Sequence, residues 1–432
     1  MTDREGRRRG RRPVRLPAWV LRTARLLGLP VGEVARYWRD ERLALERGLV
    51  ALGIGLLATL VAGVVLGSAS DRLDELPGLL LLIPAAIGMR GNNFGALAAR
   101  LGTGIHTGEF QIELRRRSYL GRQIEAAALL TFATTAMIAV FAWLIALVLG
   151  LPSIPLRDLL VISWLGGLLS SVVLLLLTVV LAREAYRRGW NMDDVGAPSI
   201  TAVGDLVTVP SLLVASLLVG RAVVSPTLGA VALASGVAAT WFGIRHETAE
   251  VRRIVRESIV VLVLAAGLDI FAGTVVEARA EGFLAVPALL VLVPPFIAAC
   301  GSLGGILASR LASKLHLGLL DPRALPGKVA GLDASVTFLF AFAAFAGVAL
   351  VTRLAAGLVG LESPPVGSLL AITLTGGLFA FLLIVAVAYT AATATFRFGL
   401  DPDNHSIPIV TATMDLLGVL CLVAAIGLVR MG

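Results

Sequence analysis

The chain has 432 residues, of which 57% are hydrophobic and only 15% are charged. A soluble domain is usually about 45–50% apolar and about 25% charged, so this composition excludes a soluble globular protein. Apolar runs of about 20 residues recur along the chain, long enough to cross a hydrocarbon core of roughly 30 Å as helices. They lack the alternation of a transmembrane β-barrel. We therefore predict an all-α polytopic membrane protein.

The segment 1–47 precedes the first apolar run and carries 13 of the 37 lysines and arginines. Residues 16–46 can form one or two amphipathic helices, with Trp19 and Trp38 as anchors at a lipid interface. We expect a basic cytoplasmic arm that lies on the lipid surface. The alternative is a regulatory plug at the cytoplasmic mouth of the protein.

Eleven apolar spans follow the arm, separated by turn and charge signals. We predict transmembrane helices at 48–68, 77–98, 124–150, 156–182, 196–219, 225–244, 257–276, 284–308, 329–352, 366–391 and 405–429.

The lysines and arginines predict how these spans cross the membrane. If the N-terminus is cytoplasmic, 30 of the 37 lie in the arm and the inner loops, six lie outside, and Arg90 lies within a span. This bias predicts a multi-pass protein of the cell (inner) membrane with its C-terminus outside. The net charge of +8 then reflects topology, and no nucleic-acid partner is needed.

Two sequence motifs recur at one offset of 210 residues. In the first motif, eight residues match: Pro84, Gly91, Gly95, Leu97, Ala98, Arg100, Leu101 and His106 correspond to Pro294, Gly301, Gly305, Leu307, Ala308, Arg310, Leu311 and His316. In the second, seven match: Gly189, Asp193, Pro198, Thr201, Ala202, Asp205 and Leu206 correspond to Gly399, Asp403, Pro408, Thr411, Ala412, Asp415 and Leu416. A constant offset across more than a hundred residues indicates an internal duplication.

Each copy holds five spans, so we divide the chain into a first repeat at 48–222, a linking helix at 223–250 and a second repeat at 251–432. The linking span returns the chain to the cytoplasmic side, so both copies enter the membrane in the same direction. We therefore expect parallel repeats related by a pseudo-two-fold axis along the membrane normal. Such a chain resembles a fused homodimer, and we expect a monomer.

Asp205 and Asp415 are the two repeat-related carboxylates inside spans. Each lies about ten residues into its helix, or roughly 15 Å deep, near the midplane of the membrane. Thr201 and Thr411 lie four residues earlier and share a helix face with them. Carboxylate and hydroxyl oxygens suit Mg²⁺ and Ca²⁺, so these four residues are candidate ligands. The alternative is that the carboxylates only hydrogen-bond a neighbouring helix.

Proline and several glycines lie in mid-span at 84–93 and 294–305. We expect them to break the helix and to free backbone carbonyls toward a cavity, with helix packing as the alternative. Asn92 adds an amide oxygen in the first copy, and Ser302 a hydroxyl in the second.

Two further polar residues within spans are not repeated. Arg90 corresponds to Cys300, and Asp269 corresponds to Thr59. We expect Arg90 to pair with a carboxylate, for which Asp269 is a candidate. Asp269 could otherwise be a proton or sodium site.

The Pro-to-Gly-x-x-Gly segment before Leu-x-x-Arg-Leu and the segment from Asp193 to Leu206 resemble the membrane domain of the MgtE magnesium channels. The doubled arrangement resembles the solute carrier family 41 transporters. The resemblance covers about 48–429 and implies a Mg²⁺ pathway in which Asp205 and Asp415 bind the ion. The chain departs from the pattern in lacking an acidic cytosolic domain and in reading Gly301-Ser302 where the first copy has Gly91-Asn92.

We predict transport of a divalent cation, Mg²⁺ first among the candidates, with the ion as cargo. The second hypothesis is Na⁺- or H⁺-coupled exchange that uses Asp269. A membrane enzyme or scaffold is the third, and we predict that the chain is not an enzyme. The sequence has no Walker loop, no His-Glu-x-x-His motif and no Ser–His–Asp arrangement.

Overall fold

The computed structural model describes residues 31–113, 115–189, 192–221, 223–322, 326–398 and 402–431. Throughout these ranges the regular structure is helical, without a strand. The first 30 residues of the predicted arm, including Trp19, lie outside the described residues.

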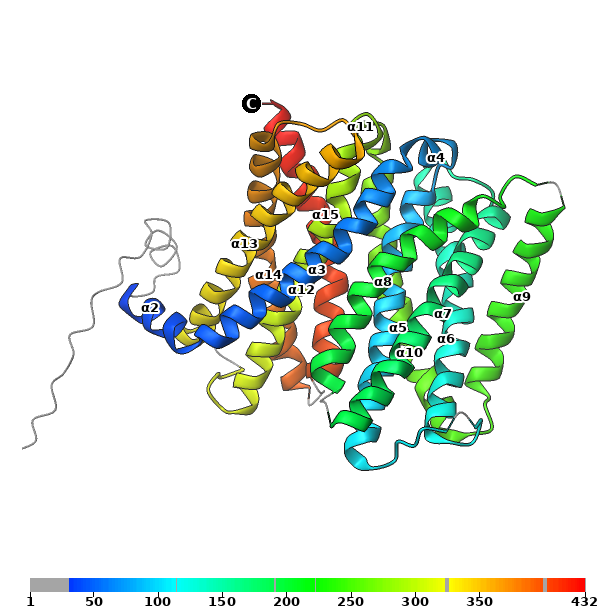
Figure 1. Ribbon diagram of the computed structural model, residues 1–432, viewed down its shortest axis with the longest axis horizontal. Coiled ribbons are helices and arrows are strands. Elements are labelled where there is room, and N and C mark those ends of the chain that lie inside the picture. Colours follow the sequence, from blue (N-terminus) through cyan, green and yellow to red (C-terminus); the bar gives the residue numbers. More distant parts are fainter. Residues whose placement is uncertain are drawn as a thin grey trace, which may run out of the picture.

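Eleven long helices follow one another in the described part, in the predicted number and order (Figure 1). They are α3 (Arg42–Ser68), α5 (Leu79–Thr107), α6 (Tyr119–Leu149), α7 (Leu156–Arg188), α8 (Met192–Ser216), α9 (Val224–Ile244), α10 (Ala249–Glu277), α12 (Pro287–His316), α13 (Lys328–Val359), α14 (Val366–Arg397) and α15 (Pro402–Met431). Three short helices accompany them: α2 (Val31–Asp40), α4 (Ser70–Glu75) and α11 (Ala280–Leu284).

The lengths and compositions of these helices confirm a polytopic membrane fold. Among the described residues, ten helices are long and apolar enough to cross a membrane. Helix α5 is not one of the ten, and its sequence carries Arg90, Asn92 and Asn93. These side chains lower its hydropathy, and they also mark it as a helix that needs polar surroundings.

The helices of the two repeats correspond in pairs, and their ends are built alike. Helices α6 and α13 both end at a glycine in the left-handed conformation, Gly150 (φ 65°) and Gly360 (φ 75°). A glycine adopts this conformation without a steric penalty and lets its N–H bond the last turn. Pro155 and Pro365 then directly precede α7 and α14. Because α9 adds one crossing, α3 and α10 start at the same end of the molecule, so the repeats are parallel as predicted (Figure 1).

The first helix of each repeat packs on the other repeat. Helix α3 packs most extensively on α12 and also on α13 of the second repeat, whereas its counterpart α10 packs most extensively on α5 and also on α6 of the first. Each first helix also contacts one fifth helix, α3 touching α8 and α10 touching α15. The halves are therefore interlocked, while α9 packs outside them on α6 and α7, at the right of Figure 1.

Two glycines at equivalent positions allow this exchange. A Cβ atom added to Gly63 would overlap the backbone oxygen of Val291 on α12, and one added to Gly273 would overlap that of Leu81 on α5. Both the glycines and their partners are 210 residues apart. Small residues let the backbones of membrane helices approach closely, so this pair fixes the two crossings.

The expected break at the proline-rich segments is wrong. Helix α5 runs unbroken through Pro84, and α12 runs through Pro294 and Pro295. A proline removes one backbone hydrogen bond, and helices packed inside a membrane protein tolerate this because neighbouring groups surround the freed carbonyl. The glycines of these segments instead provide room for side chains of other helices, as described below.

The described part of the arm packs on the protein. Tyr37 of α2 donates a 2.6 Å hydrogen bond to Asp333 at the start of α13. Trp38, expected to anchor in lipid, donates instead to the hydroxyl of Ser335 at 3.0 Å. Arg310 and Lys314 of α12 both bond the Tyr37 oxygen. Helix α2 is thus attached to the second repeat, at the end of the molecule that we call the arginine-rich end because the loop 108–118 also lies there (Figure 1).

Candidate cation-binding site

The two predicted aspartates lie on the fifth helices, each packed against the second helix of its own repeat. Asp205 is buried on α8, with 8% of its surface exposed. Asp415 is half-buried on α15. A Cβ atom added to Gly301 of α12 would lie 3.0 Å from Oδ1 of Asp415. The absence of a side chain at Gly301 therefore provides the space that this carboxylate occupies.

The same position in the first repeat is more open. Gly91 corresponds to Gly301, but a Cβ atom added there would meet nothing within 4 Å. The two sites therefore differ in shape although the motif residues match, because the carboxylate contacts the glycine in the second repeat only.

A third carboxylate lies at the place where the halves meet. Asp269 of α10 is 1% exposed, and its Oδ2 lies against Gly88 of α5. Neither of its carboxylate oxygens has a hydrogen-bond partner among the described residues. The charges of Asp269 and Asp415 repel each other, as do those of Asp415 and Asp205. Helices α5, α8, α10 and α15 thus bring three acidic side chains within electrostatic reach.

The predicted hydroxyl and amide residues are only partly gathered with the carboxylates. Thr411 is half-buried and lies beside Gly301, near Asp415. Asn92 is half-buried, whereas Thr201 and Ser302 are exposed. In the described ranges, no group of three or more His, Cys, Asp or Glu residues is arranged to hold a metal ion directly. A cation at these aspartates would keep part of its water shell, as Mg²⁺ commonly does.

Arg90 does not pair with Asp269, so that expectation is wrong. The Arg90 side chain is fully buried and points toward α7, where its Nε donates to the hydroxyl of Ser170 at 3.3 Å. An added Cβ at Gly167 of α7 would overlap its guanidinium. Its two terminal nitrogens have no hydrogen-bond partner among the described residues. Arg90 therefore lies within the bundle of the first repeat, and no Lys or Arg of the described ranges forms an ion pair with Asp269.

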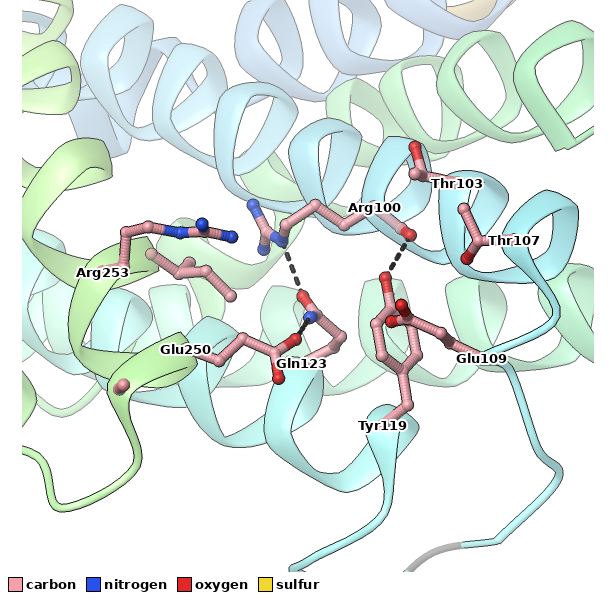
Figure 2. Close-up of a pocket in the computed structure, with 10 residues that line it drawn as sticks. Arg100, Thr103, Thr107, Glu109, Tyr119, Gln123, Glu250 and Arg253 are labelled. Carbon is pink, nitrogen blue, oxygen red and sulfur yellow. Dashed lines mark hydrogen bonds between the residues drawn. The ribbon is translucent and has the colours of Figure 1, made fainter.

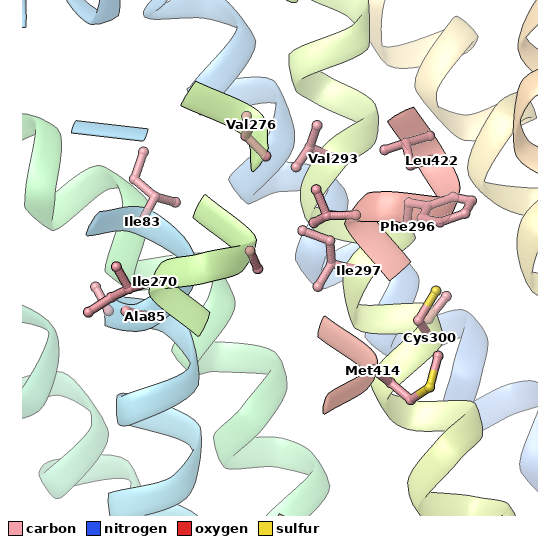
Figure 3. Close-up of a cluster of buried hydrophobic side chains, with 14 of the residues drawn as sticks. Ile83, Ala85, Ile270, Val276, Val293, Phe296, Ile297, Cys300, Met414 and Leu422 are labelled. Atoms are coloured by element: carbon pink, nitrogen blue, oxygen red, sulfur yellow. The ribbon is translucent and has the colours of Figure 1, made fainter. Parts of the chain in front are cut away.

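A cluster of buried apolar side chains from α5, α10, α12 and α15 fills the space between the halves (Figure 3). Part of this cluster lies toward the end of the molecule that holds the C-terminus. Val276 lies about two helical turns beyond Asp269 on α10, and Leu422 lies about two turns beyond Asp415 on α15. Val293 lies about two turns from Cys300 on α12 in the same direction. Ile83 of α5 and Ile297 of α12 belong to the same buried cluster. These apolar residues lie between the level of the acidic side chains and that end of the molecule.

A polar pocket of about 540 Å³ opens at the arginine-rich end of the first repeat (Figure 2). Arg100 donates to Gln123 at 2.7 Å, and Gln123 donates to Glu250 at 2.7 Å. The counterpart of Arg100 is Arg310, which bonds Asp333 and Tyr37. Burial, followed by the hydrogen bond to Asp333, raises the pKa of Tyr37. The repeated motif arginine is thus linked to the other repeat in both halves: Arg100, through Gln123, to the start of α10, and Arg310 to the arm that precedes α3.

Comparison with known families decides the class of the protein. A family model described as MgtE, divalent cation transporter, matches residues 83–215 and 293–425. These matches span more than half of the chain, and they begin 210 residues apart. The chain belongs to the MgtE divalent cation transporter family. The family predicted from the sequence is therefore confirmed, and the protein is a multi-pass membrane protein.

Curated relatives of this MgtE family member are solute carriers. Solute carrier family 41 member 3 of Rattus norvegicus is 24% identical over 389 residues, covering 85% of this chain and 82% of the relative. Member 2 of Xenopus laevis is 24% identical over 403 residues, covering 86% and 69%. Member 2 of Homo sapiens is also 24% identical, over 418 residues with the same coverage. No solved structure matches the chain.

Proposed function

We propose that the chain carries a divalent cation, with Mg²⁺ the first candidate, across the cell membrane along the interface between its halves. The observation that supports this is the position of Asp205 and Asp415 at equivalent sites of the two fifth helices, with Asp269 within electrostatic reach of Asp415. Membership of a divalent cation transporter family agrees with it.

The chemistry of the side chains suits Mg²⁺. Carboxylate, amide and hydroxyl oxygens are hard ligands, and Mg²⁺ takes few of them because it keeps several waters. In this proposal Asp205 and Asp415 supply charge, while Thr201, Thr411, Asn92 and Ser302 offer oxygens to the hydrated ion along the way. The exposure of Thr201 and Ser302 suits residues that meet an ion before or after the aspartates.

The orientation follows from the charged residues. The arginine-rich end is cytoplasmic in this proposal, since the sequence assigns 30 of the 37 Lys and Arg residues to segments predicted on the same side as the loop 108–118. The N-terminus is then cytoplasmic and the C-terminus is outside. One chain supplies both halves of the pseudo-two-fold arrangement, so the transporting unit is a monomer in the bilayer.

A second candidate is exchange of Mg²⁺ against Na⁺ or H⁺. Two observations favour it: the buried apolar cluster between the halves, which must part before an ion passes there, and the buried Asp269, for which the first repeat has Thr59. A protein that must change shape to let an ion pass and that carries an extra charge can couple two ions through that change.

Flux into liposomes tests both candidates. The purified chain is reconstituted, and Mg²⁺ entry is followed with an enclosed fluorescent indicator, with and without a Na⁺ or pH gradient. The proposal expects Mg²⁺ entry that Asp415→Asn strongly reduces. Entry that is independent of either gradient identifies a facilitator, and entry driven by one gradient identifies the exchanger. The absence of Mg²⁺ movement under every gradient would contradict both.

A further inference from the structure

The carboxylate of Asp269 is buried and has no ion-pair or hydrogen-bond partner in the part of the chain that the structure describes. Its side chain is 1% exposed, and both oxygens lack a hydrogen-bond partner among the described residues. A charged group in such surroundings costs several kcal/mol of desolvation unless another charge or hydrogen bonds compensate it. The charge of Asp415 lies within electrostatic reach and repels it. A positive ion at this place would remove both penalties.

The first repeat shows that the fold does not need this carboxylate. Thr59 is the counterpart of Asp269 on α3, and its hydroxyl donates to the backbone oxygens of Gly55 and Leu56 in its own helix, at 3.0 and 3.1 Å. A threonine is thus fully satisfied at this position. Packing alone gives no reason for an aspartate in the second repeat.

A glycine of the other repeat provides the space that the Asp269 side chain occupies. Its Oδ2 lies against Gly88 of α5, where any larger residue would displace it. Helix α10, which carries Asp269, contacts both α5 of the first repeat and α15, which carries Asp415.

We propose that Asp269 is a third cation-binding residue, which shares one divalent ion with Asp415 and makes the second repeat the tighter of two ion sites. The inference rests on the proposed transport function and deepens it. Two carboxylates supply two negative charges to one Mg²⁺, whereas Asp205 in the first repeat supplies one. With Mg²⁺ keeping several waters, both carboxylates can act on the ion directly or through water.

The decisive variant is Asp269→Thr, which copies the residue that the first repeat already holds. Magnesium binding is measured from the rise in melting temperature of the detergent-solubilised chain as Mg²⁺ is titrated. We expect the apparent Kd for Mg²⁺ to rise about tenfold or more, in the range found when groups around a metal are altered. Melting without Mg²⁺ should be unchanged or higher, because an unbalanced charge has been removed.

A second pair of variants tests geometry without changing charge. Gly88→Ala pushes on Oδ2 of Asp269, and we expect weaker Mg²⁺ binding with Asp269 still present. Gly267→Ala is the control: it lies on α10, two residues from Asp269, in open space. It should bind Mg²⁺ as the unaltered chain does.

The outcomes separate this inference from the transport function. If Asp269→Thr binds and transports Mg²⁺ with unchanged affinity while Asp415→Asn abolishes transport, the inference is wrong and the function stands. If Asp269→Thr removes only a dependence on the pH gradient, Asp269 carries a proton and the inference is again wrong. If no aspartate variant alters Mg²⁺ transport, the proposed function fails as well. Weaker binding in both Asp269→Thr and Gly88→Ala, but not in Gly267→Ala, supports the third ligand.

Discussion

The two repeats have corresponding helices, but the side chains buried between those helices differ in polarity. In the first repeat, the space beside Gly167 of α7 holds the guanidinium of Arg90 and the methyl group of Thr135. In the second, the space beside the equivalent Gly377 of α14 holds the ring of Phe345, which is 4.8 Å from the ring of Phe296 between centroids. The same backbone thus accepts a buried cation in one half and an aromatic pair in the other.

The charged residues that differ are therefore not demanded by the fold. The first repeat has an unbalanced positive charge at Arg90, and the second has an unbalanced negative charge at Asp269. The aspartates of the fifth helices are common to both. A duplicated chain can keep its ion-binding helices and still make the two halves unequal, and this inequality favours a cation in the second half.

The largest effect should come from the shared aspartates taken singly. We expect Asp415→Asn to slow Mg²⁺ transport about 10–100-fold and Asp205→Asn to slow it less, because only the second site combines two carboxylates. The measurement is the initial rate of Mg²⁺ entry into liposomes at several concentrations. A larger effect at Asp205 would reverse the ranking of the two repeats.

The crossings of α3 with α12 and of α10 with α5 should be equally sensitive to a larger residue at their glycines. We expect Gly63→Ala and Gly273→Ala each to destabilise the chain by about 1–3 kcal/mol, because the new methyl group meets a backbone oxygen. Thermal melting in detergent checks this. Gly53→Ala on α3 and Gly267→Ala on α10 are controls in open space. If one glycine tolerates the change and the other does not, the two crossings are not equivalent.

Arg90 should be dispensable for stability. Replacing a buried, unpaired ion with an apolar residue of similar size is often neutral or stabilising. We therefore expect Arg90→Met to raise the free energy of unfolding by about 1 kcal/mol or leave it unchanged. The measurement is thermal melting, with Cys300→Met, at the equivalent position of α12, for comparison. A strong loss of stability in Arg90→Met would show that the guanidinium has a partner that holds the bundle together.

The smallest effect should come from the docked arm. Tyr37→Phe removes one hydroxyl, and we expect a loss of about 0.5–1.5 kcal/mol and faster proteolytic cleavage near α2. Since the pKa of Tyr37 is raised above 10.0, its neutral form is favoured. Its contribution is complete below pH 10.0 and falls only as the pH rises through the elevated value, so cleavage should not depend on pH near neutrality. Cleavage that changes there would assign the docking to other groups.

Much of the fold could be predicted from the sequence. Apolar runs predict the membrane-spanning helices, basic loops predict their direction, and the constant offset reveals the duplication. The exchange of α3 and α10 could not, because Gly63 and Gly273 resemble any other glycines until their backbone partners are known. Trp38 was assigned to lipid because an exposed amphipathic helix and a docked one have the same periodicity.

The candidate site divides in the same way. Asp205 and Asp415 stand out because a carboxylate in mid-span is costly and occurs twice. Arg90 and Asp269 carry opposite charges, and pairing was the natural expectation, but helix rotation directs one toward α7 and the other toward Gly88. Sequence spacing within one helix does not reveal which neighbouring helix a side chain meets.

The central claim is that Asp205 and Asp415 carry the cation between the halves, and the double variant Asp205→Asn, Asp415→Asn tests it most directly. Each substitution keeps the shape and one oxygen but removes the charge. The measurement is Mg²⁺ entry into liposomes containing equal amounts of folded protein, judged by its melting without Mg²⁺. We predict folded protein and a loss of Mg²⁺ entry greater than in either single variant. Entry at the unaltered rate and affinity would show that the carboxylates serve helix packing and that the ion passes elsewhere.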